Sequence, residues 1–109
     1  MKKNKRKRKI SIVTGSRSEY GLLYWLIKDL FDDDGIDLSL VVTGMHLSNE
    51  YGNTVLEIEK DGFKIDEKIE VLLSSDTGTS ISKSMALCLI GFSEYLNRKS
   101  PDIVVVMGD

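Results

Sequence analysis

The sequence predicts an α/β fold in which a parallel sheet is flanked by helices. Short segments rich in apolar and β-branched residues alternate with segments of helical periodicity along the chain. The predicted order is strand, helix, strand, helix, strand, helix, strand, which is typical of right-handed crossover connections between parallel strands. No internal repeat or shift in composition marks a second domain, and 109 residues with 41% hydrophobic content suit a single domain with a core.

The first half of the chain predicts two strands and the helix between them. Residues 10–14 (ISIVT) are apolar on nearly every side, as expected for a strand that is buried on both faces. We expect the next helix to end at residues 32–35 (DDDG), because acidic side chains are unfavourable at a helix C-terminus and Gly35 suits the cap. Residues 36–43 (IDLSLVVT) form the second predicted strand. The apolar residues at three- and four-residue spacing on the helix are Leu22, Leu23, Leu26, Ile27 and Leu30.

The second half predicts a short helix over residues 54–60, a weaker strand over residues 63–73 and a Ser/Thr/Gly loop over residues 74–80. A long helix follows, and Pro101 cannot continue it. Residues 102–107 form the last predicted strand. Cys88 lies within the apolar pattern of the long helix, so we expect a buried thiol rather than a nucleophile. The apolar face of this helix comprises Ile81, Met85, Cys88, Leu89, Phe92 and Leu96.

The distribution of charge is strongly asymmetric. Seven of the 15 basic residues lie in the first nine positions (MKKNKRKRK), whereas the chain has 17 acidic residues in all. A basic segment of this kind can bind nucleic acid or an anionic membrane, or can simply be a solvated leader. Because residues 1–9 contain no aromatic residue and no helical periodicity, we expect a disordered, solvated leader, with no nucleic-acid or membrane partner.

Several classes of protein are disfavoured by composition. The basic segment is not followed by a continuous apolar stretch, so no signal peptide is predicted, and no segment is long enough to span a bilayer. One His and one Cys give no support for a metal site. We therefore expect a cytoplasmic protein without a metal.

Polar residues follow each predicted strand, at the edge where a parallel α/β sheet binds its ligands. The first strand is followed by Gly15, Ser16 and Arg17, the second by Gly44 and His46, the third by residues 74–79 and the last by Asp109. Cation, imidazole, hydroxyl and carboxylate groups at one edge predict a site for a phosphorylated ligand.

The turn after the first strand has both a structural and a functional interpretation. Ser16 and Glu19 have the spacing of a capping box, in which Ser16 accepts from the Glu19 amide and Glu19 reaches back to the Ser16 amide. That motif alone explains both residues. Arg17 is different, because a cation in the first turn opposes the helix dipole but suits an anion site beside free amides. The glycine spacing of GSRSEYG matches neither the dinucleotide nor the nucleotide-triphosphate loop.

His46 and Asp109 each have a structural alternative. His46 can be a capping or surface residue of its loop, although its position at the predicted edge favours a functional role. Asp109 can be a turn residue. It directly follows an apolar strand, however, where a partly desolvated carboxylate can act as acid or base.

Three segments together resemble the hydrolysing UDP-N-acetylglucosamine 2-epimerases. They are TGSRSEYG after the first strand, VVTGMHLSNEYGNTVLEIEKDGF after the second and PDIVVVMGD at the end. The resemblance covers residues 10–109. It implies two Rossmann-like domains in a glycosyltransferase-B arrangement, of which this chain would supply part of the N-terminal domain. We therefore expect residues 1–109 alone to be inactive, and a homo-oligomer in the full-length form.

The resemblance also implies a reaction and residue roles. The reaction is hydrolysis of UDP-N-acetylglucosamine, or a UDP-diacetamido sugar, with inversion at C2, and it feeds sialic- or legionaminic-type acid synthesis without a cofactor. Arg17 would contact the phosphates beside Ser16 and Glu19, while His46 and Asp109 would face the sugar.

One position separates the two branches of the family. Non-hydrolysing relatives carry a Lys where this chain has Leu22, which favours the hydrolysing branch. A UDP-sugar glycosyltransferase of the same architecture and a non-catalytic flavodoxin-like nucleotide-binding module are the alternatives at this stage.

Overall fold

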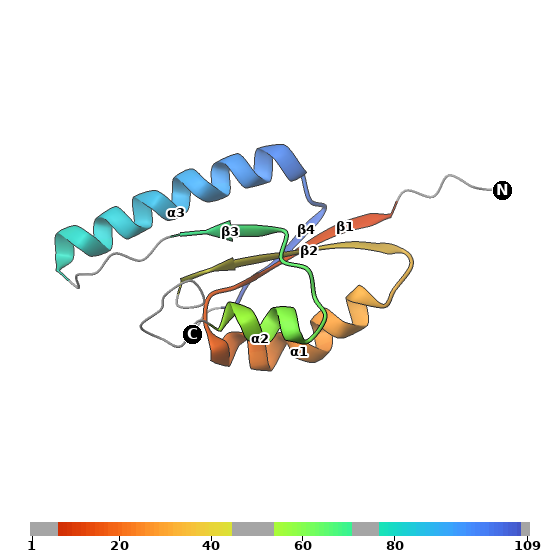
Figure 1. Ribbon diagram of the computed structural model, residues 1–109. Coiled ribbons are helices and arrows are strands. Elements are labelled where there is room, and N and C mark those ends of the chain that lie inside the picture. The colour runs from red at the N-terminus through yellow and green to blue at the C-terminus, as the bar shows by residue number, and fades with distance from the viewer. Residues whose placement is uncertain (1–6, 45–53, 71–76, 108–109) are drawn as a thin grey trace.

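The computed structural model of the protein describes residues 7–44, 54–70 and 77–107. Strands and helices alternate along this part of the chain (Figure 1), so the predicted α/β fold class is confirmed. In chain order the elements are β1 (Arg8–Thr14), α1 (Arg17–Phe31), β2 (Ile36–Thr43), α2 (Val55–Lys60), β3 (Glu67–Ile69), α3 (Gly78–Lys99) and β4 (Ile103–Val105).

The strands of the described residues form one parallel sheet in the order β3-β2-β1-β4. Helices α1 and α2 lie on one face of the sheet and α3 on the other (Figure 1). The chain moves from β1 to β2 to β3 across one half of the sheet. It then returns through α3 to place β4 on the other side of β1, as right-handed crossovers require. The predicted Rossmann-like sheet flanked by helices is therefore confirmed.

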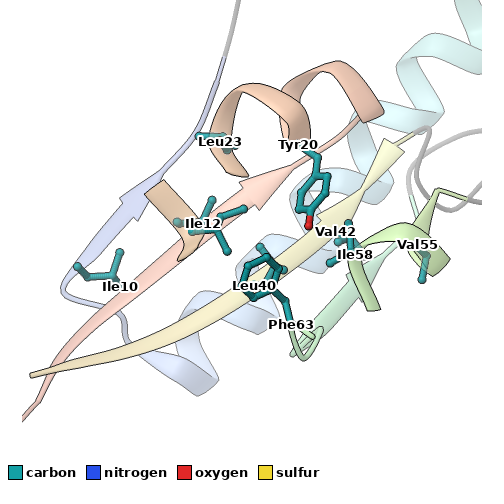
Figure 2. Close-up of a cluster of buried hydrophobic side chains, with 10 residues drawn as sticks. Ile10, Ile12, Tyr20, Leu23, Leu40, Val42, Val55, Ile58 and Phe63 are labelled. Carbon is teal, nitrogen blue, oxygen red and sulfur yellow. The ribbon is translucent and has the colours of Figure 1, made fainter. Parts of the chain in front are cut away.

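The larger core lies between the sheet and the α1–α2 layer. Side chains from both central strands, both helices and the segment after α2 converge there (Figure 2). Tyr20, Leu23 and Ile27 form the buried stripe of α1, at three- and four-residue spacing. The buried members of this core are Ile10, Ile12, Tyr20, Leu23, Ile27, Leu40, Val42, Val55, Ile58 and Phe63.

A smaller core joins the opposite face of the sheet to α3. Val41 and Ile69 pack there with Tyr95, which is only 1% exposed. The Tyr95 hydroxyl lies 2.7 Å from Ser11 Oγ, so the buried hydroxyl of β1 has its hydrogen-bond partner on α3. Gly91 allows a close approach, because a Cβ at that position would lie 2.5 Å from Ile69 Cγ2.

The first strand begins earlier than its sequence predicts. Arg8 and Lys9, which fall in the predicted leader, are part of β1. The Arg8 amide donates to the Gly35 carbonyl at 3.0 Å, and the Lys9 amide donates to Asp102 Oδ2 at 2.8 Å. These partners are distant in sequence, so local composition could not reveal them. Residues 1–6, the rest of the predicted leader, lie outside the described residues.

The turn after α1 is closed differently from the prediction. Asp32 is the C-cap residue with right-handed backbone angles, and Gly35 does not cap the helix. Instead, Asp33 Oδ1 accepts from the Gly35 amide at 2.8 Å, because an aspartate carboxylate readily closes a local turn.

Three other predicted boundaries also move. The weak strand predicted over residues 63–73 is confined to Glu67–Ile69 among the described residues, and β4 is shorter than predicted, at Ile103–Val105. Residues 78–80, predicted as loop, already belong to α3. They do so because the Thr77 hydroxyl accepts from the Ser80 amide and caps the helix.

The predicted apolar face of α3 is mostly not buried. Ile81, Met85 and Leu89 are 54%, 64% and 70% exposed, and Leu96 is 40% exposed. Cys88 is only partly buried, so the expectation of a buried thiol is wrong. The N-terminal half of α3, which includes Ile81 and Met85, extends beyond the end of β3 (Figure 1), and this explains the exposure of these two residues.

Helix α1 shows a smaller departure of the same kind. Leu22 and Leu26 are 74% and 41% exposed, because the buried stripe of the helix runs through Tyr20 instead.

In the described residues, no helix is both long and apolar enough to cross a membrane.

Candidate functional site

The strand order defines where a ligand would bind. All pairings within the described sheet are parallel, so the strand ends that carry the predicted polar residues lie at one edge. The connection from β1 leads to β2, whereas β4 is reached from β3 through the opposite face. The direction of winding therefore reverses between β1 and β4. In open α/β sheets, ligands bind in the crevice outside the carboxyl ends of the strands at this point.

The turn between β1 and α1 is held by its own side chains. Ser16 is the N-cap of α1 with extended backbone angles, and its hydroxyl accepts from the Glu19 amide at 3.3 Å. Glu19 Oε1 accepts from the Gly15 amide at 2.8 Å, rather than from the Ser16 amide that a capping box predicts. The first half of the predicted box is confirmed and the second half is wrong by one residue. The physical reason is that Gly15, without a side chain, lets the carboxylate approach its amide.

Arg17 has a partner in the fold. Its Nε donates to Glu57 Oε2 on α2 at 2.9 Å, and its terminal amine contacts the same oxygen. Both side chains are substantially exposed, 71% for Arg17 and 47% for Glu57. The sequence offered no folding role for this cation, and Glu57 supplies one. The predicted role of Arg17 in binding phosphate stays a prediction. The ion pair is compatible with that role, because one carboxylate oxygen engages only some of the five N–H donors of the guanidinium group.

A second polar contact ties α1 to the end of α2. The Tyr20 hydroxyl donates to Asp61 Oδ2 at 2.5 Å. Burial, followed by this hydrogen bond, raises the pKa of Tyr20 well above its ordinary value. Arg17 and Tyr20 are three residues apart on α1, and Glu57 lies four residues before Asp61, the C-cap of α2, so each pair lies along one side of its helix.

Sequence reasoning missed the two acidic partners. Glu57 and Asp61 lie 40 and 41 residues from the α1 residues that they contact. No local motif announces such pairs, and only the packing of α2 beside α1 brings them together.

The turns after β1 and β2 touch through their backbones. Gly44 has a left-handed φ of +62°, and a Cβ there would lie 2.7 Å from the Gly15 carbonyl oxygen. The structure thus brings the residue after β2 against the residue that precedes Ser16. His46 and Asp109, the predicted sugar-facing residues, and residues 74–76 of the predicted third loop lie outside the described residues.

Metal-ligating side chains do not gather in the described part of the chain. Within residues 7–44, 54–70 and 77–107, no three His, Cys, Asp or Glu side chains are placed to hold an ion together. The polar groups of the β1–α1 turn are amides, hydroxyls and the Arg17 guanidinium, which suit an anionic ligand, together with the carboxylates of Glu19 and Glu57, which pair with the Gly15 amide and with Arg17.

Comparison with protein families decides the relationship. The sequence model of the UDP-N-acetylglucosamine 2-epimerase family matches residues 28–109. The chain belongs to this family. The match includes β2, α2, α3 and β4, while the Arg17 turn precedes the matched region.

Curated relatives extend the similarity over 94% of the chain. A Legionella pneumophila protein named UDP-N,N'-diacetylbacillosamine 2-epimerase (hydrolyzing) is 45% identical over 102 residues. A Campylobacter jejuni protein named GDP/UDP-N,N'-diacetylbacillosamine 2-epimerase (hydrolyzing) is 45% identical over 103 residues. The Escherichia coli polysialic acid biosynthesis protein P7 is 41% identical over 102 residues. The chain spans only about a quarter of the length of these family members, 27% of the first two and 26% of the third.

Solved structures of the family share the fold. A crystal structure of a UDP-N-acetylglucosamine 2-epimerase superposes with a TM-score of 0.78 at 23% identity, over 95% of this chain and 26% of that one. At this identity the similarity concerns the fold alone, and it agrees with the Rossmann-like, glycosyltransferase-B-type sheet expected for this epimerase family.

Proposed function

We propose that the protein is a hydrolysing UDP-sugar 2-epimerase, of which these 109 residues form part of the N-terminal domain. The observation that carries this proposal is the 45% identity to two relatives that are both named hydrolyzing diacetylbacillosamine 2-epimerases. Because both names specify an N,N'-diacetylbacillosamine nucleotide, we favour a UDP-diacetamido sugar over UDP-N-acetylglucosamine as the substrate. The products are then UDP and the 2-epimeric free sugar, which supplies synthesis of a sialic- or legionaminic-type acid.

The chemistry has two steps. In the first, a base removes the C2 proton while the C1–O bond to the diphosphate breaks, which gives a glycal and UDP. In the second, water adds its hydroxyl to C1 and a proton returns to C2 from the opposite face. The C2 proton is not acidic, so the first step needs strong stabilisation of the leaving diphosphate and a well-placed acid or base.

The described turn offers what the leaving group needs. The amides at the start of α1 and the Arg17 guanidinium stand at the carboxyl edge of the sheet, where a diphosphate would gain charge-assisted hydrogen bonds. Ser16 and Glu19 hold the backbone of this turn, so we assign them a supporting place beside the phosphates. His46 and Asp109 are proposed to face the sugar, with Asp109 as acid or base at C1–C2.

The remaining parts of the proposal concern the full-length protein. A second Rossmann-like domain would close the cleft and contact the uridine, and the enzyme would act as a cytoplasmic homo-oligomer. The described strand order supports only the second domain, because the point where the winding reverses lies at the edge that such a domain would face.

The test is an assay of the full-length protein with UDP-N,N'-diacetylbacillosamine and with UDP-N-acetylglucosamine. We expect release of UDP, together with a free sugar whose C2 configuration is inverted when examined by NMR. Release of a sugar with unchanged C2 configuration would contradict the proposal. A strict requirement for an acceptor would instead identify a glycosyltransferase.

A further inference from the structure

Gly44 occupies a position that a residue with a Cβ can take only with backbone strain and a shift of its neighbours. Its φ of +62° lies in the left-handed region, which side chains with a Cβ disfavour. A Cβ at Gly44 would also lie 2.7 Å from the carbonyl oxygen of Gly15 and 3.4 Å from its carbonyl carbon and Cα. The requirement for glycine therefore has two separate causes, one in the backbone angle and one in the contact.

Gly15 cannot easily move away from a side chain introduced at position 44. Its amide is held at 2.8 Å by Glu19 Oε1, and a Cβ on Gly15 would itself lie 3.2 Å from that oxygen. A continuous set of contacts therefore runs from the end of β2 to the first turn of α1, through Gly44, Gly15 and the Glu19 carboxylate. The next two residues after Gly15 are Ser16, the N-cap, and Arg17, so a shift of the Gly15 carbonyl moves both.

We propose that Gly44 is a positioning residue for the ligand-binding turn. Its contact with the Gly15 carbonyl fixes the position of the β1–α1 turn relative to the end of β2. The amides at the start of α1 and the Arg17 side chain are thereby positioned to bind the diphosphate. This inference rests on the proposed function, because it takes a UDP-sugar to be the ligand of that turn. Ordinary contact with a Cβ begins at 3.4 Å, so the Gly15 carbonyl oxygen must move by about 0.7 Å to accept a Cβ that would lie at 2.7 Å. A shift of this size exceeds the roughly 0.5 Å within which binding groups must be held.

The chain offers a matched control for the backbone strain. Gly62 also has a positive φ, +92°, but a Cβ there would meet nothing within 4 Å. In the full-length enzyme, Gly44→Ala and Gly62→Ala both introduce left-handed strain, and only Gly44→Ala introduces the contact with Gly15. Each variant is compared with wild type by UDP titration calorimetry, normalised to the folded fraction, and by kcat and KM with the UDP-sugar.

We expect Gly44→Ala to weaken UDP binding by roughly tenfold per folded molecule, in keeping with the cost of misplaced binding groups. Gly62→Ala should lower the melting temperature while keeping the wild-type affinity. If Gly44→Ala does not fold, Gly15→Ala serves instead. Its φ is not left-handed, and its Cβ would press on Glu19 Oε1 from the other side, so we expect a smaller loss of about threefold.

The outcomes separate this inference from the proposed function. Wild-type UDP affinity in every folded variant, or equal losses in Gly44→Ala and Gly62→Ala, would overturn the positioning role and leave the epimerase proposal intact. Failure of the wild-type enzyme itself to bind UDP would remove the proposed function, and this inference with it.

Discussion

Replacing Arg17 by Ala separates its structural contact from its proposed contact with the substrate. In the described residues, the structural contact is the ion pair with Glu57, in which Nε and Oε2 are 2.9 Å apart. The side chains are 71% and 47% exposed, so water screens the pair strongly. Exposed ion pairs of this kind contribute about 0.2–1 kcal/mol to stability. Loss of the Arg17 side chain should therefore change the melting temperature of the full-length enzyme by only a few degrees.

The effect on UDP binding should be much larger. A hydrogen bond to a charged group contributes about 1.5–3 kcal/mol when its partner is not otherwise satisfied. Since 1.4 kcal/mol corresponds to a tenfold change, we expect Arg17→Ala to raise the Kd for UDP roughly ten- to a hundredfold. Titration calorimetry measures the Kd, and thermal unfolding of the same samples measures the stability.

Glu57→Gln is the matched control. It removes the charge of the partner and leaves the guanidinium group in place, so stability should fall as in Arg17→Ala while the Kd for UDP stays within about threefold of wild type. If Arg17→Ala and Glu57→Gln lose the same stability and both retain the wild-type Kd, Arg17 does not bind the diphosphate. Arg17 would then be a structural residue only.

Two further predictions concern the fold in the full-length enzyme. Gly91→Ala should lower the melting temperature, although alanine favours helices by about 1 kcal/mol, because its Cβ would lie 2.5 Å from Ile69 Cγ2. Gly21→Ala, in α1, should raise the melting temperature, because its added Cβ would meet nothing within 4 Å. A higher melting temperature for Gly91→Ala than for Gly21→Ala would contradict the packing described. The pKa of Tyr20 is raised in the folded state, so the folded state holds its proton more tightly and stability is lost as pH rises above the ordinary value of 10.0. Denaturant midpoints from pH 8 to 11 should therefore fall less steeply in Tyr20→Phe, which lacks the hydroxyl bonded to Asp61, and parallel slopes would argue against this linkage.

The sequence predicted the elements that depend on local pattern. The apolar run of residues 10–14 and the alternation in Ile36–Thr43 indicated the two central strands, and the order of elements was enough to predict a parallel sheet. The Ser16 cap was likewise predictable, because an N-cap hydroxyl acts within three residues.

The predictions that were wrong or incomplete concern residues whose environment depends on what packs against their helix. Periodicity marked an apolar stripe on α3 through Ile81 and Met85, but in the described part of the helix the buried residue is Tyr95. Tyr95 packs with Val41 and Ile69, and its hydroxyl hydrogen-bonds to Ser11, 84 positions away in sequence. Arg17 lacked a folding explanation for the same reason, since Glu57 is separated from it by 40 positions. An apolar stripe or a charged residue can be recognised from the local sequence, whereas the residues that it contacts are determined by the tertiary fold.

The central claim is that the full-length enzyme breaks the C2–H bond of a UDP-sugar and inverts that centre. The most direct measurement is to run the reaction in D₂O with UDP-N,N'-diacetylbacillosamine and to examine the released sugar by NMR and mass spectrometry. Elimination and hydration predict a 2-epimeric sugar in which one deuterium replaces hydrogen at C2. A released sugar that retains its original hydrogen and configuration at C2 would contradict the account, because simple hydrolysis or glycosyl transfer never breaks that bond.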